Sequence, residues 1–230
     1  MKYIIIKILF VLFFLSDASA NLKIDITQGN NKPIPIVLLD FNTDKSELKK
    51  LSIKISSVIT SNLERSGLFE LMKKGLIIED EIKFNSKPNF SNWRVTTAQG
   101  LVHGRIIQLD RDQIALEFRL WDILSEKQMV AQQLTTKISN WRRISHVISD
   151  IIYQRITGES GYFDSRIVYI SESGRKKNRK KRLAIMDQDG ANHKFLTDGS
   201  YLALTPRFSP AAQEVAYFSY HNGAPRVFLL

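Results

Sequence analysis

Near the N-terminus, apolar and polar residues alternate with a period of two. The apolar positions are Leu22, Ile24 and Ile26. The polar positions between them are Lys23, Asp25 and Thr27. Strict alternation is typical of a strand with one buried face, so the pattern predicts a strand here. Residues 29–33, with the sequence GNNKP, then predict a turn or linker, because glycine, asparagine and proline interrupt regular structure.

The next part of the chain predicts two long helices and a sheet. Residues 46–66 and 140–157 repeat apolar side chains at spacings of three and four, and Gly67 and Gly158 stand where left-handed helix caps are wanted. The expected strands cover residues 36–41, 68–72, 101–109, 113–120 and 129–138, and a short helix is expected near residues 91–99. The last three strands are separated by short turns, which favour antiparallel hairpins. Residues 36–160 are therefore expected to form an α+β domain, a mixed sheet with helices on one face.

After residue 161 the pattern changes to short strands, and it contains an internal repeat. Residues 166–171 match residues 214–219 at an offset of 48, and residues 182–186 match 226–230 at an offset of 44. Both offsets follow if one strand pair occurs twice and the loop at residues 172–181 is four residues longer in the first copy. A period in the forties is the size of a propeller blade. We therefore expect residues 161–230 to form about one and a half blades of an incomplete β-propeller.

The last residues, Val227 to Leu230, read as the middle of a strand, and closed propellers need roughly four to eight blades. The expectation is a chain truncated within its propeller, with a complete protein that ends in a small β-sheet as the alternative.

The first twenty residues have the order of a secretory signal. Lys2 and Lys7 precede an apolar run at residues 8–15, and small side chains follow at Ala18 and Ala20. The apolar run is shorter than the roughly 20 residues that span a bilayer. Cleavage is therefore expected near Ala20, so that the mature chain begins at Asn21 and works in the periplasm. An N-terminal anchor helix is the alternative.

The net charge of +10 is concentrated in one place, because seven lysines and arginines stand between Arg175 and Arg182. Such a run can bind nucleic acid, but an exported protein does not ordinarily meet it, so no nucleic-acid partner is expected. A solvated hairpin tip is the simplest interpretation, and contact with anionic lipid headgroups is the alternative. The chain has no cysteine, which excludes cysteine catalysis and thiolate metal sites.

No catalytic, cofactor or metal site is expected. The four histidines are scattered, which disfavours a zinc site. The run at residues 187–190, DQDG, starts like a calcium loop, but its twelfth position is Asp198 rather than the usual glutamate, and a hairpin turn is the better interpretation. Ser160 lacks the spacing of a nucleophile elbow. Trp93, Trp121 and Trp141 stand in or beside periodic apolar elements, which favours core packing over ligand binding.

Several segments, in their order along the chain, resemble the TolB family, the periplasmic component of the Tol-Pal envelope system. They are SNLERSGLF at residues 61–69, WRR at 141–143, YQRITGE at 153–159, FDSRIVY at 163–169, DQDGAN at 187–192 and PRFSP at 206–210. The chain departs from the family pattern at residues 211–213, AAQ, where blades usually carry Asp-Gly, and in lacking most of a six-bladed propeller.

The resemblance implies a protein without chemistry of its own that links inner-membrane TolA to the outer-membrane lipoprotein Pal. Such a protein would help to keep the outer membrane intact and to draw it inward at division. The family's TolA-binding element maps onto residues 21–31, with Leu22, Lys23, Ile24, Asp25, Ile26 and Thr27 as the binding residues. Pal would dock at the mouth of the propeller channel, mostly beyond Leu230.

Two alternatives stay open. The N-terminal strand could remain docked on its own domain instead of joining a partner's sheet edge. The chain could also be an accessory propeller fragment of a prolyl-oligopeptidase-like secreted peptidase, because such peptidases use related propellers.

Overall fold

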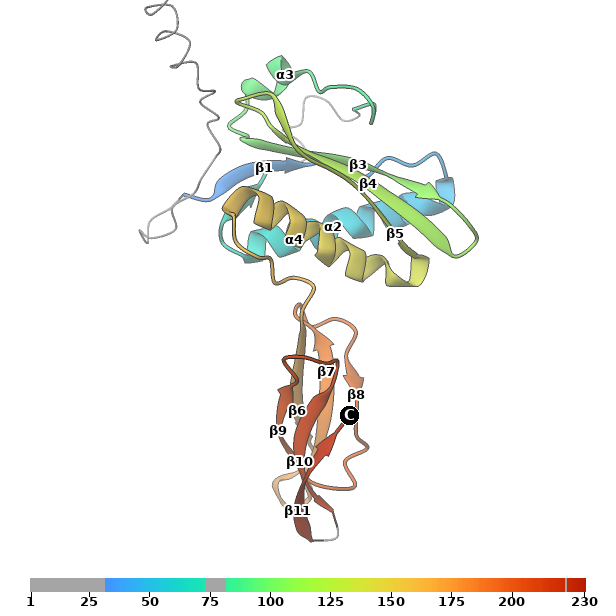
Figure 1. The fold of residues 1–230 in the computed structure, drawn as a ribbon, viewed down its shortest axis with the longest axis vertical. Coiled ribbons are helices and arrows are strands. Elements are labelled where there is room, and N and C mark those ends of the chain that lie inside the picture. The colour runs from blue at the N-terminus through green and yellow to red at the C-terminus, as the bar shows by residue number, and fades with distance from the viewer. Residues whose placement is uncertain (1–31, 73–81, 222) are drawn as a thin grey trace, which may run out of the picture.

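The computed structural model describes residues 32–72, 82–221 and 223–230. The expected signal and N-terminal strand lie outside these residues. Figure 1 shows an N-terminal α/β domain above a smaller unit of β-strands, joined by a single connection after helix α4.

The N-terminal domain is built on one five-stranded mixed sheet in the order β2-β1-β3-β4-β5. Strand β1 lies between β2 and β3 and is parallel to both, whereas β3, β4 and β5 are successive antiparallel neighbours. The strands are β1 (Ile34–Leu38), β2 (Phe69–Leu71), β3 (Gly100–Gln108), β4 (Gln113–Asp122) and β5 (Lys127–Lys137). All five were expected from the sequence, and the fold class is confirmed.

The two long helices lie side by side on one face of this sheet (Figure 1). They are α2 (Lys49–Arg65) and α4 (Trp141–Thr157), each preceded by a 3-10 turn, η1 (Ser46–Leu48) and η3 (Ile138–Asn140). Gly67 and Gly158 have φ angles of 72° and 80°, as expected for left-handed caps. In the described part of the chain, no helix has the length and apolar character needed to cross a bilayer.

The opposite face of the sheet is covered at one end by α3 (Phe90–Arg94), whose Trp93 packs with Phe90 and Trp121. This helix is shorter than the expected 91–99. The Thr96 hydroxyl donates to the Trp93 carbonyl oxygen, and the Gln99 N–H donates to the Pro35 carbonyl oxygen. The chain therefore leaves the helix and enters β3. All three tryptophans belong to this domain, and Trp93 and Trp121 are core residues as expected.

Gly104 in β3 marks a close approach between the sheet and the loop after β1. A Cβ at this position would lie 2.5 Å from the Glu117 carbonyl oxygen and 2.6 Å from the Phe41 ring. Neither the paired backbone of β4 nor the buried ring can withdraw freely. We expect Gly104→Ala to lower the free energy of unfolding by about 2 kcal/mol, the range of overpacked cores, in a denaturant titration. Unchanged stability would show that the packing here is loose.

The C-terminal unit consists of two three-stranded sheets in the orders β6-β7-β8 and β11-β10-β9. Their strands are β6 (Arg166–Ser173), β7 (Lys180–Asp187), β8 (Lys194–Phe195), β9 (Ala203–Phe208), β10 (Val215–His221) and β11 (Ala224–Leu229). The turn η4 (Lys176–Asn178) lies between β6 and β7. A small apolar cluster around Leu183, Ala203 and Val215 joins the two sheets.

The pairing register confirms the internal repeat. Tyr169 pairs with Ala184 in the first hairpin, and Tyr217 pairs with Phe228 in the second. Tyr217 follows Tyr169 by 48 residues, and Phe228 follows Ala184 by 44 residues, which are the two offsets found in the sequence. The difference of four residues lies in the loop between β6 and β7, so the basic run is at a hairpin tip as expected.

Candidate functional site: the joint between the domains

The binding residues expected from the sequence cannot be placed. The cleavage residues Ala18, Ala20 and Asn21, and the segment from Leu22 to Thr27, lie outside the described residues. The first described strand, β1, has a neighbour on both sides, so it offers no free edge. The site that the structure does define is the contact between the N-terminal domain and the β-unit.

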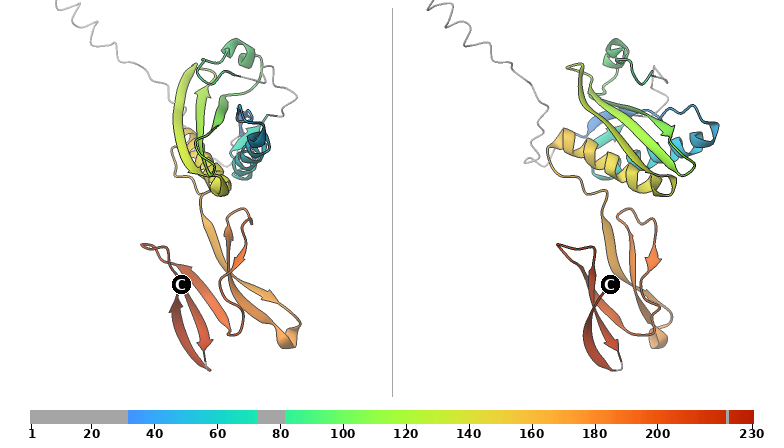
Figure 2. Two further views of the ribbon diagram at one scale, coloured as in Figure 1. Left: turned by 90° about the vertical axis from the view of Figure 1, so that its right-hand side faces the viewer. Right: turned by 45° about the vertical axis from the view of Figure 1, so that its right-hand side comes forward.

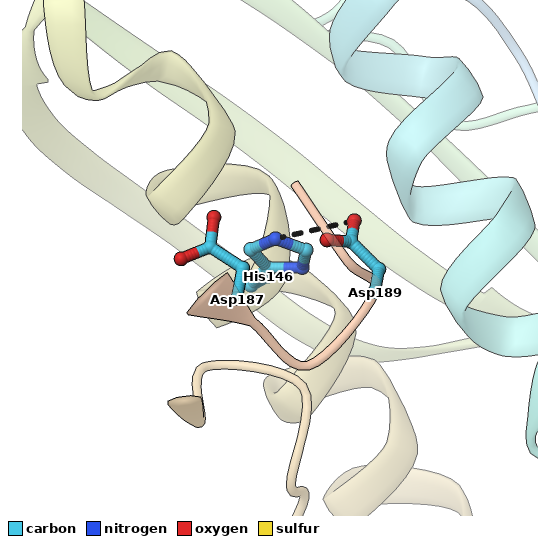
Figure 3. A group of neighbouring side chains, drawn as sticks. All are labelled: His146, Asp187 and Asp189. Atoms are coloured by element: carbon cyan, nitrogen blue, oxygen red, sulfur yellow. Dashed lines mark ion pairs between the residues drawn. The ribbon is translucent and has the colours of Figure 1, made fainter. Parts of the chain in front are cut away.

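We call this contact the domain joint. One side is formed by polar side chains of α2 and α4, and the other by the turn between β7 and β8. Figure 3 shows His146 on α4 facing Asp187 and Asp189 on this turn. The residues of the joint are Asn62, Arg65, Arg142, His146, Asp187, Gln188 and Asp189.

Asn62 is at the centre of the joint and is fully buried. Its side-chain oxygen accepts hydrogen bonds from Arg65 at 2.7 Å and from the Gln188 amide at 3.2 Å. Its amide nitrogen donates to His146 Nδ1 and to Ser149 Oγ, both at 2.9 Å. The Arg65 guanidinium also donates to Gln188 Oε1 at 3.3 Å. One amide side chain thus ties α2, α4 and the β7–β8 turn together.

The hydrogen bonds of Asn62 fix the proton on His146. Because the amide oxygen of Asn62 receives two donors, its nitrogen must donate to Nδ1, and the neutral ring carries its proton on Nε2. This N–H faces Asp189, with 3.7 Å between Nε2 and Oδ2, the contact drawn as a dashed line in Figure 3. Burial lowers the pKa of His146, although Asp189 and Asp187 act in the opposite direction.

Arg142 supplies the positive charge that faces the two aspartates of the joint. Its guanidinium donates to Asp189 Oδ2 and lies 4.0 Å from Asp187. Burial of Asp189 favours its neutral form, but the Ala191 N–H and Arg142 outweigh burial and lower the pKa of this carboxyl. The expected turn at residues 187–190 is present, since the Gly190 N–H donates to the Asp187 carbonyl oxygen at 2.9 Å.

The connection between the domains is itself held against α4. Asp150 accepts the backbone N–H groups of Phe163 at 2.7 Å and Asp164 at 3.0 Å, while Arg143 binds Asp164 at 3.2 Å. The Phe163 ring is fully buried and packs edge-on against Tyr153. Linker and turn are therefore both fixed to the same helix, which restricts the orientation of the β-unit.

The joint is poorly suited to a metal ion or to catalysis. His146, Asp187 and Asp189 offer ligand atoms within 4.8 Å of one another, but the Arg142 guanidinium already binds Asp189 and lies 4.0 Å from Asp187, and Nε2 of the neutral His146 ring carries a proton. The Ser149 hydroxyl donates to the Ser145 carbonyl oxygen at 2.9 Å rather than to the histidine. A cavity of about 300 Å³ beside the joint is lined by charges of both signs, including Arg143, Asp164 and Lys194.

The scattered histidines gave no sign of this site, because His146 meets Asp187 and Asp189 only after the domains are placed. A signal was nevertheless present. The segments 61–69, 141–143 and 187–192, quoted for the family resemblance, contribute Asn62, Arg65, Arg142, Asp187, Gln188 and Asp189 to the joint. Three of the six segments quoted for the resemblance thus converge on one contact.

Comparison with known protein families gives a match for each of the two domains. The model of the TolB amino-terminal domain matches residues 22–129, and that of the TolB beta propeller domain matches residues 153–230. The Tol-Pal system protein TolB of Paramagnetospirillum magneticum is 47% identical over 92% of this chain and 47% of its own length. The same-named protein of Pelagibacter ubique is 46% identical over 98% of this chain and 53% of its own length.

Among solved structures, TolB from Acinetobacter baumannii matches 86% of this chain and 47% of its own length, with a TM-score of 0.72 and 26% identity. The chain spans about half the length of the curated relatives it matches. Two domain models in the family's order, these relatives and this fold lead to one conclusion: the chain belongs to the TolB family.

Proposed function

We propose that this chain is a non-catalytic, periplasmic protein-interaction component of the Tol-Pal system. It links a TolA-like protein of the inner membrane to a Pal-like lipoprotein of the outer membrane. In this role it supports outer-membrane integrity and the inward movement of that membrane during division. The observation that carries the proposal is the match of both halves of the chain to TolB domains, in the family's order.

The TolA contact is assigned to residues 21–28, after removal of a signal peptide that ends at Ala20. An alternating strand can add to the free sheet edge of a partner, where backbone hydrogen bonds provide affinity. Leu22, Ile24 and Ile26 would then set the register, because a slip by one residue turns the apolar side chains to the wrong face. The linker at residues 29–33 leads into β1, which is fixed within the sheet.

The domain joint supports this role as a structural element. It holds the domain that follows the TolA-binding segment and the first strands of the propeller in one orientation, and the Pal contact is expected mostly beyond Leu230. No step of the proposal needs a cofactor or a reactive side chain. The relatives share the TolB name over nearly the whole of this chain, which favours an interaction component over a peptidase accessory.

Deletion of residues 21–28 tests the proposal. We expect the deletion to abolish capture of the periplasmic part of a TolA-like protein, measured by titration calorimetry. The helical circular dichroism signal should stay unchanged, because the deleted residues precede the sheet and helices of the α/β domain. Capture at full affinity would refute the assignment of the TolA contact.

A matched pair of triple variants separates the two faces of the strand. Leu22→Ser/Ile24→Ser/Ile26→Ser removes three apolar side chains, each worth roughly 1.5 kcal/mol when buried, and should weaken capture about a thousandfold. Lys23→Ser/Asp25→Ser/Thr27→Ser keeps the apolar face and should weaken it less than about tenfold, since exposed polar contacts contribute little. The opposite ranking would contradict strand addition through the apolar face.

A further inference from the structure

The tip of the β6–β7 hairpin carries a dense group of positive charges. Seven of the eight residues from 175 to 182 are lysine or arginine. Five of these cations are exposed, and they are Arg175, Lys176, Lys177, Arg179 and Lys180. We call residues 175–182 the basic tip. Neither the domain joint nor the proposed TolA contact uses it.

Part of this charge is compensated within the β-unit. Glu172 binds Arg179 at 2.9 Å and Lys181 at 2.7 Å, and these bonds lower the pKa of the Glu172 carboxyl. The Arg182 guanidinium lies over the Phe195 ring at 3.5 Å from its centroid. Arg175, Lys176 and Lys177, in contrast, have no ion-pair partner in the described residues. The foremost cations of the tip are therefore free to meet an external anion.

The shape and position of the basic tip restrict the kind of anion. The tip is the end of a two-stranded hairpin and points away from the N-terminal domain, whereas the β7–β8 turn at the other end contacts α4 (Figure 2). A tip that projects away from the N-terminal domain can approach a plane without steric hindrance from that domain. Residues 174–182 contain no aromatic side chain, so they offer no stacking platform for single-stranded nucleic acid.

We propose that the basic tip contacts anionic phospholipid headgroups at a membrane surface. Arg175, Lys176 and Lys177 supply most of the attraction, and the hairpin holds them at the end of the β-unit that lies away from the N-terminal domain (Figure 2). Basic clusters gain attraction from each lysine or arginine close to an anionic surface, and the effect declines within a Debye length. The contact adds direct membrane adhesion to the protein-mediated links of the proposed function and does not depend on them.

Sedimentation with lipid vesicles tests the proposal. The full chain should bind vesicles of phosphatidylglycerol and phosphatidylcholine at 0.1 M salt, and binding should fall steeply at 0.5 M. Arg175→Gln/Lys176→Gln/Lys177→Gln should weaken binding about a hundredfold, at roughly fivefold per charge removed. Each variant is also sedimented without lipid, so that self-association is subtracted, and its circular dichroism spectrum is compared with that of the parent.

The matched control is Lys45→Gln/Lys49→Gln/Lys50→Gln, which removes the same charge from exposed positions of the N-terminal domain. It should lower vesicle binding less than about threefold, because these lysines lie outside the tip. All variants share the same first thirty residues, so any contribution of that segment cancels in the comparison. Equal losses in both triple variants, no loss in the tip variant, or equal binding to pure phosphatidylcholine would overturn the proposal. So would tip-dependent binding that is tighter to duplex DNA than to the anionic vesicles.

Discussion

Replacing Asn62 with alanine is expected to destabilise the N-terminal domain by about 3 kcal/mol and to loosen the connection to the β-unit. The substitution removes four hydrogen bonds from a fully buried position. It leaves His146 Nδ1 without a donor and the Arg65 and Gln188 donors without their shared acceptor, and buried polar groups without partners cost about 1–3 kcal/mol each. Denaturant unfolding followed by tryptophan fluorescence measures the loss, since all three tryptophans belong to this domain.

Two further variants separate the joint from the fold of the domain. Ser61→Ala changes an exposed neighbour on the same helix and should stay within about 0.5 kcal/mol of the parent, as is usual for surface positions. Gln188→Ala removes only the partner on the β-unit. It should lower stability by about 1 kcal/mol yet speed protease cleavage at residues 158–165 as Asn62→Ala does. If Asn62→Ala leaves both stability and cleavage unchanged, Asn62 does not hold the joint.

Acidification is expected to destabilise the N-terminal domain through His103. This buried histidine in β3 accepts a hydrogen bond from Trp121 Nε1 at its Nε2, at 3.0 Å, which only the neutral ring can do. Burial, followed by the positive charge of Arg119, lowers the pKa of His103 to about 4. In the unfolded chain a histidine takes up its proton near pH 6.5. The unfolded state therefore binds the proton first, and stability declines as the pH falls.

The free energy of unfolding should fall by about 3 kcal/mol between pH 6.5 and pH 4. Above pH 6.5 the neutral His103 ring provides its full contribution to stability. Denaturant unfolding at a series of pH values, followed by tryptophan fluorescence, measures the fall. His103→Gln keeps an acceptor for Trp121 but does not titrate, so its stability should fall much less over the same range. A smaller decline caused by His146, whose pKa is lowered as well, should remain in this variant. Parallel curves for the parent and His103→Gln would show that His103 is not the source.

The elements of the fold could be predicted because their signals are local. The stripes of α2 and α4 end at glycines that adopt the expected left-handed conformation. The offsets of 48 and 44 predicted that one strand pair occurs twice, and the structure repeats its register: Tyr169 pairs with Ala184, and the equivalent Tyr217 pairs with Phe228. The length of α3 was overestimated, since the hydrogen bond of the Thr96 hydroxyl to Trp93 leaves no trace in the apolar pattern.

The domain joint could not be predicted from spacing, because it depends on how two domains meet. His146 looks like an isolated histidine on a helix, and Asp187 and Asp189 look like turn residues. Likewise, His103 and Trp121 form their hydrogen bond only after β3 and β4 pair in the observed register. The family resemblance marked the right segments but did not say that they touch.

The central claim is that the protein works outside the cytoplasm as an exported partner of other proteins. Intact-mass measurement and N-terminal sequencing of the protein from separated cell fractions test this claim most directly. The account predicts a chain that begins at Asn21 in the periplasmic fraction. A chain that still begins at Met1 and stays with the cytoplasmic fraction would contradict it.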